Sequence, residues 1–326
     1  MQAAAWCFLL LALVELLVRT LGDRFIACGE DVDFRRRVRQ LTSAPSAEVV
    51  IVGDSLAQRG IAPGSFPTAS PHGVLNLGVT AGTGVIARAL AGSATWRPDH
   101  VVFAGNPALV FDAAPLEVDE AQITSILDRP LWPFVTGDVL LGKISQAFAR
   151  RADILIAIRR MLRLRRVLPP GDIVWEPGLR EEEGGFLAFH PESMPSSADR
   201  TRYAHMVLKQ WFARPDRENG FRRRMVSDAL RAWSGPSTAR HLVMMPQSDE
   251  YRVALQSYVS VAMVRDAWRT AAHEGDADLL DCTQSVSDDA FGDHYHLEAS
   301  AARAFSVGLA AWVQDHKVPT GCRVIE

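Results

Sequence analysis

The chain has 326 residues, of which 48% are hydrophobic and 22% charged, and its formal net charge is −3. This composition is typical of a globular protein and excludes disordered and fibrous chains, and the length allows one large core or two modest ones. Because the net charge is slightly negative, no overall positive field attracts nucleic acid. We therefore expect no nucleic-acid partner.

An apolar segment opens the chain. Residues 3–18 (AAAWCFLLLALVELLV) contain a single ionisable side chain, Glu15, and form a short candidate for a membrane span. A carboxylate inside a span costs about 3 kcal/mol, which several leucine and phenylalanine side chains at about −0.5 kcal/mol each can offset. We predict an uncleaved membrane anchor over residues 1–22. The alternatives are a removed signal peptide and a buried N-terminal helix.

Residues 23–45 are predicted to connect the anchor to the rest of the chain, with a polar, arginine-rich helix from Asp31 to Leu41. Basic residues cluster after the apolar run, and by themselves they favour a cytoplasmic domain. A natural start upstream of Met1 would remove that conflict with an exported domain. The basic residues concerned are Arg19, Arg24, Arg35, Arg36 and Arg37.

The four cysteines are too few and too scattered for a disulfide framework or a metal site. Cys7 lies in the apolar run, which leaves Cys28, Cys282 and Cys322 with one odd thiol among them. Their pairing is therefore open.

Short apolar segments then alternate with stretches of helical length. This alternation predicts a parallel sheet covered by helices on both faces, and thus an α/β fold with a three-layer α/β/α sandwich over residues 46–318. A helix is expected from Val85 to Ala91. The predicted strands are Glu48–Val52, Gly73–Leu77, His100–Ala104, Arg240–Met245 and Ala277–Cys282.

Between the third and fourth predicted strands the chain is far longer than one crossover helix requires. We predict a large insert over about residues 112–235, which in α/β folds usually forms a lid over the substrate. Residues 147–168 (AFARRADILIAIRRMLRLRRVL) read as a basic amphipathic helix, which either is a solvated helix with one buried stripe or contacts an anionic membrane surface. Helical periodicity resumes from Ala198 to Phe212.

The first predicted strand ends in Gly53-Asp54-Ser55, within VVIVGDSLAQRG. One interpretation is ordinary turn chemistry. The other is that Ser55 is a nucleophile at the carboxyl edge of a parallel sheet, where open α/β sheets bind their ligands.

Near the C-terminus, Asp293 and His296 lie three residues apart, before an amphipathic helix from Leu297 to Val313. This spacing lets the carboxylate accept the ring N–H and leaves the other nitrogen free to take a proton from a hydroxyl. Two alternatives are that Asp293 caps the helix, or that His294 and His296 bind a metal. No further ligand completes a metal site, so we expect no metal and no cofactor.

These blocks together, with Asn76-Leu77-Gly78 after the second strand, resemble the SGNH (GDSL) hydrolase superfamily. The resemblance implies a flavodoxin-like SGNH fold, Ser55 as nucleophile and Asp293 and His296 as its partners. It also implies an oxyanion hole made by the backbone N–H groups of Ser55 and Gly78.

One block departs from the family pattern. The superfamily usually has Gly-x-Asn-Asp after the third strand, whereas this chain has Gly105-Asn106-Pro107. Asn106 is therefore a third candidate oxyanion donor that lies outside the family pattern. Losing such a donor typically slows an enzyme by about 100- to 1,000-fold.

Four features resemble the membrane-anchored SGNH partners of membrane-bound O-acyltransferases in bacterial surface-polymer acylation: the apolar N-terminus, the Gly-Asp-Ser block followed by RGIAP, the altered third block, and MMPQSDEYR after the fourth strand. That resemblance implies serine-dependent O-acyl transfer, with acetyl as the expected group, or ester hydrolysis on a cell-surface polysaccharide or wall polymer. It places the domain on the outer side of the bacterial cytoplasmic membrane. The alternative is a catalytically silent SGNH-fold module that binds a glycan or the acyltransferase.

Overall fold

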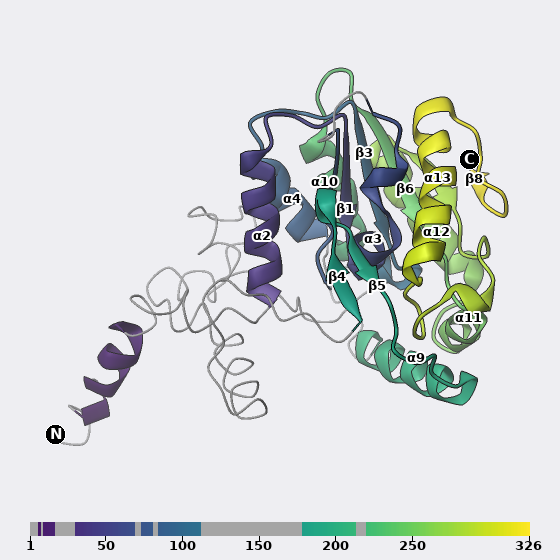
Figure 1. The fold of residues 1–326 in the computed structure, drawn as a ribbon, viewed down its shortest axis with the longest axis horizontal. Helices are drawn as coiled ribbons and strands as arrows, with labels where there is room; N and C mark the ends of the chain where they lie inside the picture. Colours follow the sequence, from purple (N-terminus) through teal and green to yellow (C-terminus); the bar gives the residue numbers. More distant parts are fainter. Residues whose placement is uncertain are drawn as a thin grey trace. The chain divides into compact units, whose positions relative to one another are not determined.

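The computed structural model describes residues 6–7, 9–16, 30–68, 73–80, 84–111, 178–212 and 220–326. The chain divides into two compact units, and the second, residues 37–115 and 175–326, contains the sheet (Figure 1). In the first unit, residues 6–7 and 9–16 are helical. None of the helices in the described part of the chain is both long and apolar enough to cross a membrane. Most of the predicted anchor lies outside that part.

The predicted connecting helix is confirmed as α2, Glu30–Ser43. Its second half belongs to the unit that contains the sheet. There the buried Arg37 donates through Nε to the carbonyl oxygen of Gly78 (3.0 Å) and ties the helix to the segment after β2.

The central sheet has the strand order β2-β1-β3-β6-β7-β8. All neighbouring pairs are parallel except β7 and β8. The parallel strands are short apolar runs buried on both faces, as a covered parallel sheet requires, and the five predicted strands are confirmed. Strand β8 was not predicted. The bounds are β1 Val49–Gly53, β2 Val74–Asn76, β3 His100–Gly105, β6 Ala239–Met244, β7 Asp278–Asp281 and β8 Arg323–Ile325.

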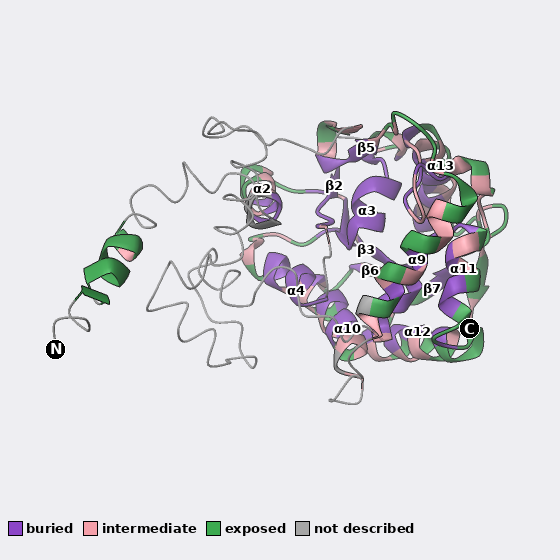
Figure 2. Ribbon diagram, turned by 90° about the horizontal axis from the view of Figure 1, so that it is seen from below, coloured by how far each residue is buried: buried purple, intermediate pink, exposed green. Residues whose placement is uncertain are grey.

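Helices cover both faces of the sheet, which makes the unit an α/β structure with a mostly parallel sheet (Figure 2). One face carries α3 (Ser55–Gly60) and α13 (Ala299–Asp315), which pack against each other. The other carries α4 (Gly84–Ser93), α10 (Phe221–Trp233) and α12 (Val261–Gly275), with α10 packed on the other two. The expected helices near residues 85–91 and 297–313 are confirmed as α4 and α13.

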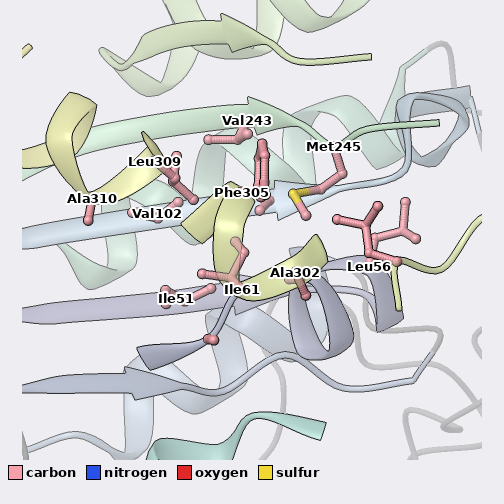
Figure 3. Close-up of a cluster of buried hydrophobic side chains, with 14 of the residues drawn as sticks. Ile51, Leu56, Ile61, Val102, Val243, Met245, Ala302, Phe305, Leu309 and Ala310 are labelled. Carbon is pink, nitrogen blue, oxygen red and sulfur yellow. The ribbon is translucent and has the colours of Figure 1, made fainter. Parts of the chain in front are cut away.

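The apolar face of α13 forms the core on the side of the sheet that α3 also covers. Phe305 and Leu309 lie over Val102 and Val243 of the central strands (Figure 3). Burying a side chain of this size contributes about 1.5–3 kcal/mol. This packing fixes the start of α13, and the loop before it, relative to the sheet.

Between β3 and β6 the structure describes an antiparallel hairpin of β4 (Leu179–Glu181) and β5 (Leu187–Phe189), followed by α9 (Ser197–Trp211) and α10. Because α10 packs on α4 and α12, this end of the predicted insert is part of the helical layer of the sheet. Residues 112–177, with the predicted basic helix, lie outside the described residues. After β6 comes α11 (Asp249–Gln256).

Short 3₁₀ helices complete the described elements. They are η1 Pro63–Ser65, η2 Pro107–Phe111, η3 Glu183–Gly185 and η4 Asp288–Ala290.

A disulfide joins Cys282, directly after β7, to Cys322, directly before β8. It resolves the pairing that the sequence left open, and it ties the antiparallel edge strand to its neighbour. Cys7 is a free, exposed thiol, and Cys28 lies outside the described residues.

Candidate active site

Ser55 is the first residue of α3, directly after the carboxyl end of β1. The turn that places it needs a glycine at position 53, because φ is +143° there and a Cβ atom would lie 1.7 Å from the carbonyl oxygen of Ala104. Asp54 is the N-cap of α3, and its Oδ1 accepts the N–H of Leu56 (2.9 Å). The Gly-Asp-Ser block therefore forms a fixed strand-to-helix turn.

The Asp54 carboxylate also holds the turn against the next strand. Its Oδ2 accepts the backbone N–H of Asn106, which follows β3, at 2.9 Å. Burial raises the pKa of Asp54 to about 6, although the N–H groups of Asn106 and Leu56 stabilise the charged form. Asp54 thus couples the segments after β1 and β3 and is not directed at a reacting group.

His296 lies beside Ser55, although 241 residues separate them in the chain. The Nε2 atom of His296 is 2.9 Å from Ser55 Oγ, and its Nδ1 is 2.7 Å from Asp293 Oδ2. If Nδ1 carries the proton and donates it to Asp293, Nε2 is an acceptor for the hydroxyl of Ser55. The structure brings the three residues into one hydrogen-bonded chain.

Asp293 is held by the loop that it belongs to. Its Oδ1 accepts the backbone N–H groups of Tyr295 (2.8 Å) and His296 (2.7 Å). Burial raises the pKa of Asp293, but the charge and hydrogen bond of His296 outweigh burial and hold that pKa well below its ordinary value. Asp293 does not cap α13, because Glu298 is the N-cap, so that alternative is wrong.

Two of the expected oxyanion donors, the backbone N–H groups of Ser55 and Gly78, differ in their hydrogen bonding. Ser55 lies in the first turn of α3, where a helix offers its N–H groups no carbonyl partner. The N–H of Gly78 instead donates to Asn76 Oδ1 (3.0 Å). Gly78 also passes close to α3, since a Cβ atom there would lie 2.7 Å from the backbone nitrogen of Gln58. Its role as a donor stays a prediction.

Asn106 lies at the same edge of the sheet, and both polar atoms of its side chain form hydrogen bonds. Its Nδ2 donates to the hydroxyl of Tyr251 in α11 (2.9 Å), and its Oδ1 accepts the N–H of Ala108 (2.9 Å). An amide nitrogen carries two hydrogens, so the bond to Tyr251 leaves one for a ligand.

Three residues near the hydrogen-bonded Ser55, His296 and Asp293 were not singled out individually by sequence reasoning. Arg59 has Nη1 3.4 Å from His296 Nδ1, and Phe189 of β5 meets the His296 ring edge-on at 6.3 Å between centroids. Tyr251 holds Asn106. Arg59 could have been found, because it lies four residues after Ser55 on a helix that starts there. Phe189 and Tyr251 carry no local signal.

Within the described residues no group of three histidine, cysteine or acidic side chains could hold a metal ion. Burial lowers the pKa of His294 to about 4, with Asp293 opposing that shift. His294 stacks on Tyr203 of α9 at 6.0 Å between ring centroids, so it packs between a helix and the loop before α13.

Comparisons of the chain with protein-family models, with curated proteins and with solved structures give no match.

Proposed function

We propose that this chain is a serine-dependent acyl-transfer enzyme of the SGNH type, which carries an acyl group as an ester of Ser55. The observation that carries the proposal is the continuous contact from Ser55 Oγ through His296 to Asp293. The same arrangement activates a serine in otherwise unrelated hydrolases, where geometry and roles identify it. If these three side chains only filled space, nothing would require the imidazole to lie between the hydroxyl and the carboxylate.

In the proposed reaction, His296 Nε2 takes the proton of Ser55 as Oγ bonds to the ester carbonyl carbon. The negative oxygen is stabilised by the N–H of Ser55, with Gly78 or Asn106 able to join after a small rearrangement. The alcohol leaves with the proton from His296. A second alcohol or water then gives its proton to His296 as it bonds to the acyl carbon. His296 returns that proton to Ser55 Oγ as the bond between the acyl carbon and Oγ breaks, while Asp293 orients the ring throughout.

The SGNH fold is part of this proposal. Support comes from the turn after β1, the segment after β2 and the loop before α13, which meet at one edge of a mostly parallel sheet. Open α/β sheets bind their ligands at this edge.

The proposed acceptor is a hydroxyl of a cell-surface polysaccharide or wall polymer, with a membrane-bound O-acyltransferase as the source of acyl groups. This part rests on the sequence resemblance and on the predicted anchor. The Cys282–Cys322 disulfide supports an exported domain, because disulfides persist in oxidising compartments outside the cytoplasm. Alkaline phosphatase fused after Glu326 should be active in bacteria, since that enzyme requires export, and an inactive fusion would contradict the location.

A serine-directed phosphonate tests the chemistry on the full-length chain. We expect mass spectrometry to find the label on Ser55 in the wild-type protein and to find none in Ser55→Ala or His296→Gln. The matched control is Ser260→Ala, which removes the hydroxyl at the N-cap of α12 and should label like wild type. Absence of label from folded wild-type protein would overturn the proposal.

A second candidate function is a catalytically silent module that binds a glycan or the acyltransferase. The observation in its favour is that the Gly78 N–H and the Asn106 amide already have protein partners. Under this candidate, Ser55→Ala would leave polymer acylation in cells unchanged. Under the proposed enzyme, the same substitution abolishes polymer acylation together with the weak hydrolysis of a chromogenic acetate ester.

A further inference from the structure

Arg59 is a buried cation beside the Ser55–His296 pair. Its side chain leaves α3 one helical turn after Ser55, and the residue is only 8% exposed. Residues at positions i and i+4 of a helix share a face. The positive charge of Arg59 therefore lies on the side of α3 that carries the Ser55 hydroxyl.

Within the described part of the chain, no carboxylate forms an ion pair with Arg59 and its buried Nε has no hydrogen-bond partner. Its contacts are the imidazole of His296 at 3.4 Å and the ring of Phe189, whose centroid is 6.0 Å from the guanidinium carbon. A ring face attracts a cation but accepts no conventional hydrogen bond. Among the described residues, the Nε of the guanidinium is thus desolvated without the acceptor that normally compensates.

Two other arginines of this unit, the partly buried Arg200 and the buried Arg37, show what compensation looks like. Arg200 donates through Nε and Nη2 to Glu250 at 3.1 and 2.7 Å. Arg37 lies 3.7 Å from Glu181 and donates to the carbonyl of Gly78. A buried charge without such partners is costly and is usually paired or bound to a ligand.

The contact with His296 does not account for Arg59. Nδ1 of His296 already faces the Asp293 carboxylate at 2.7 Å, so its hydrogen is used and its ring offers Arg59 no free lone pair on that side. A cation beside the imidazole also opposes formation of the imidazolium that the proposed reaction requires. A bound anion would satisfy the guanidinium and remove that opposition at once.

We propose that Arg59 binds an anionic group, a carboxylate or a phosphate, of the acyl acceptor, and so selects acidic polymers over neutral ones. The planar guanidinium suits both anions, because each can accept two parallel N–H bonds. The identification of the anion as part of the acyl acceptor rests on the proposed function. Binding of the anion itself can be measured without any reaction.

Binding is measured by calorimetry on the full-length chain with three probes: glucuronate, glycerol 3-phosphate and neutral glucose. We expect one of the anions to bind wild type and Ser55→Ala alike, and more tightly than glucose. Arg59→Gln should weaken that binding by about 10- to 100-fold, the usual range for a lost charged hydrogen bond, and Arg59→Lys should recover part of it. Whichever anion binds identifies the acceptor as a uronate or a phosphate polymer.

The matched control is Arg303→Gln, which removes the same charge from the arginine paired with Glu182, where 43% of the side chain is exposed. It should leave anion binding unchanged. Equal binding of anions and glucose to the wild-type chain would overturn the proposal without the use of any variant, and so would unweakened binding in a folded Arg59→Gln protein.

A transfer assay separates this inference from the proposed function. With p-nitrophenyl acetate as donor, the ratio of acetyl transfer to the anion over transfer to glucose should fall at least about tenfold in Arg59→Gln. Anion binding that depends on Arg59, in a protein that shows no transfer and no phosphonate labelling, would refute the enzyme and keep the anion site. Transfer to both acceptors with an unchanged ratio would keep the enzyme and refute the role of Arg59.

Discussion

Two buried histidines, one in the loop before α13 and one in β6, lie near opposite ends of the parallel strands and have different surroundings. His296 meets Ser55 at the carboxyl edge and is bonded to Asp293. His241, in the first half of β6, is fully buried, with Nε2 3.2 Å from Nδ1 of His100 at the start of β3. The edge of its ring faces Trp312 of α13. His296 is hydrogen-bonded to a carboxylate and lies beside a hydroxyl, whereas His241 lies against an imidazole and an indole, with the carboxylate of Asp278 3.9 Å from its Nδ1.

The difference shows what turns a buried imidazole into a base. Burial, assisted by His100 and His316, lowers the pKa of His241 to about 3, so this ring is neutral at ordinary pH. A carboxylate such as Asp293 has the opposite effect, because it stabilises the imidazolium. Burial without a directly hydrogen-bonded carboxylate makes a structural histidine, and burial with one makes a candidate general base.

The largest expected effect comes from removing each histidine in turn. Under the proposed function, His296→Gln should reduce ester hydrolysis by about 10⁴- to 10⁶-fold, as loss of a general base does in serine hydrolases. His241→Gln should keep the wild-type rate at pH 8, because it lies at the other edge of the sheet. Initial rates on folded variants check this, and equal losses would refute the contrast.

The next effect concerns the carboxylate alone. Asp293→Asn can keep the bonds to the backbone N–H groups of Tyr295 and His296, but its amide turns a donor toward Nδ1. His296 is then forced into the tautomer with hydrogen on Nε2, which cannot take the proton of Ser55. We expect a loss of about 10⁴-fold in kcat. Asp278→Asn, 3.9 Å from His241, is the control and should leave kcat unchanged.

A smaller effect is acid destabilisation at the amino edge. The folded pKa of His241, about 3, is below the unfolded value of 6.5, so the unfolded chain binds more protons between these pH values. This contribution to stability is complete above pH 6.5 and is lost as the pH falls. Between pH 7 and 5 it amounts to about 2 kcal/mol. Measured by urea unfolding, the free energy of unfolding of His241→Gln should fall between pH 7 and pH 5 by about 2 kcal/mol less than that of wild type. An identical pH dependence of the two proteins would contradict this.

The smallest effect has the opposite sign and comes from the carboxyl edge. The folded pKa of Asp54, about 6, is above the ordinary value of 3.8, so its contribution to stability is present at low pH and is lost as the pH rises through 6. From pH 7 to pH 5, wild type should gain about 1 kcal/mol relative to Asp54→Asn. Urea unfolding of wild type and Asp54→Asn at pH 7 and pH 5 measures this difference in the free energy of unfolding. A gain of wild type toward high pH would show that the buried carboxylate is stabilised as an anion.

Most of the sheet could be predicted from the sequence, because a strand buried on both faces needs a continuous apolar run and such runs are visible locally. The runs around Val50, Val102 and Val243 each became a central strand. Strand β8 could not be found this way. Its burial is low, and it is held by pairing with β7 and by the disulfide, neither of which leaves a local pattern.

The candidate site likewise combines residues that could be identified from the sequence with contacts that could not. Gly53, Ser55, Asp293 and His296 stand in short motifs whose spacing has a chemical reason, so the sequence alone singled them out. It could not show that Asn106 is held by Tyr251 or that Gly78 gives its N–H to Asn76. Those contacts depend on which loops meet at the edge of the sheet.

By itself, the sequence determined the parallel α/β architecture and the serine, histidine and aspartate motifs, because hydrophobic periodicity and residue spacing are local properties of a chain. The tertiary structure alone decided that Ser55 and His296 lie 2.9 Å apart and that Arg59 is buried beside them without an acidic partner among the described residues. Both results depend on the packing of α3 against α13, in which residues more than 200 positions apart share one core.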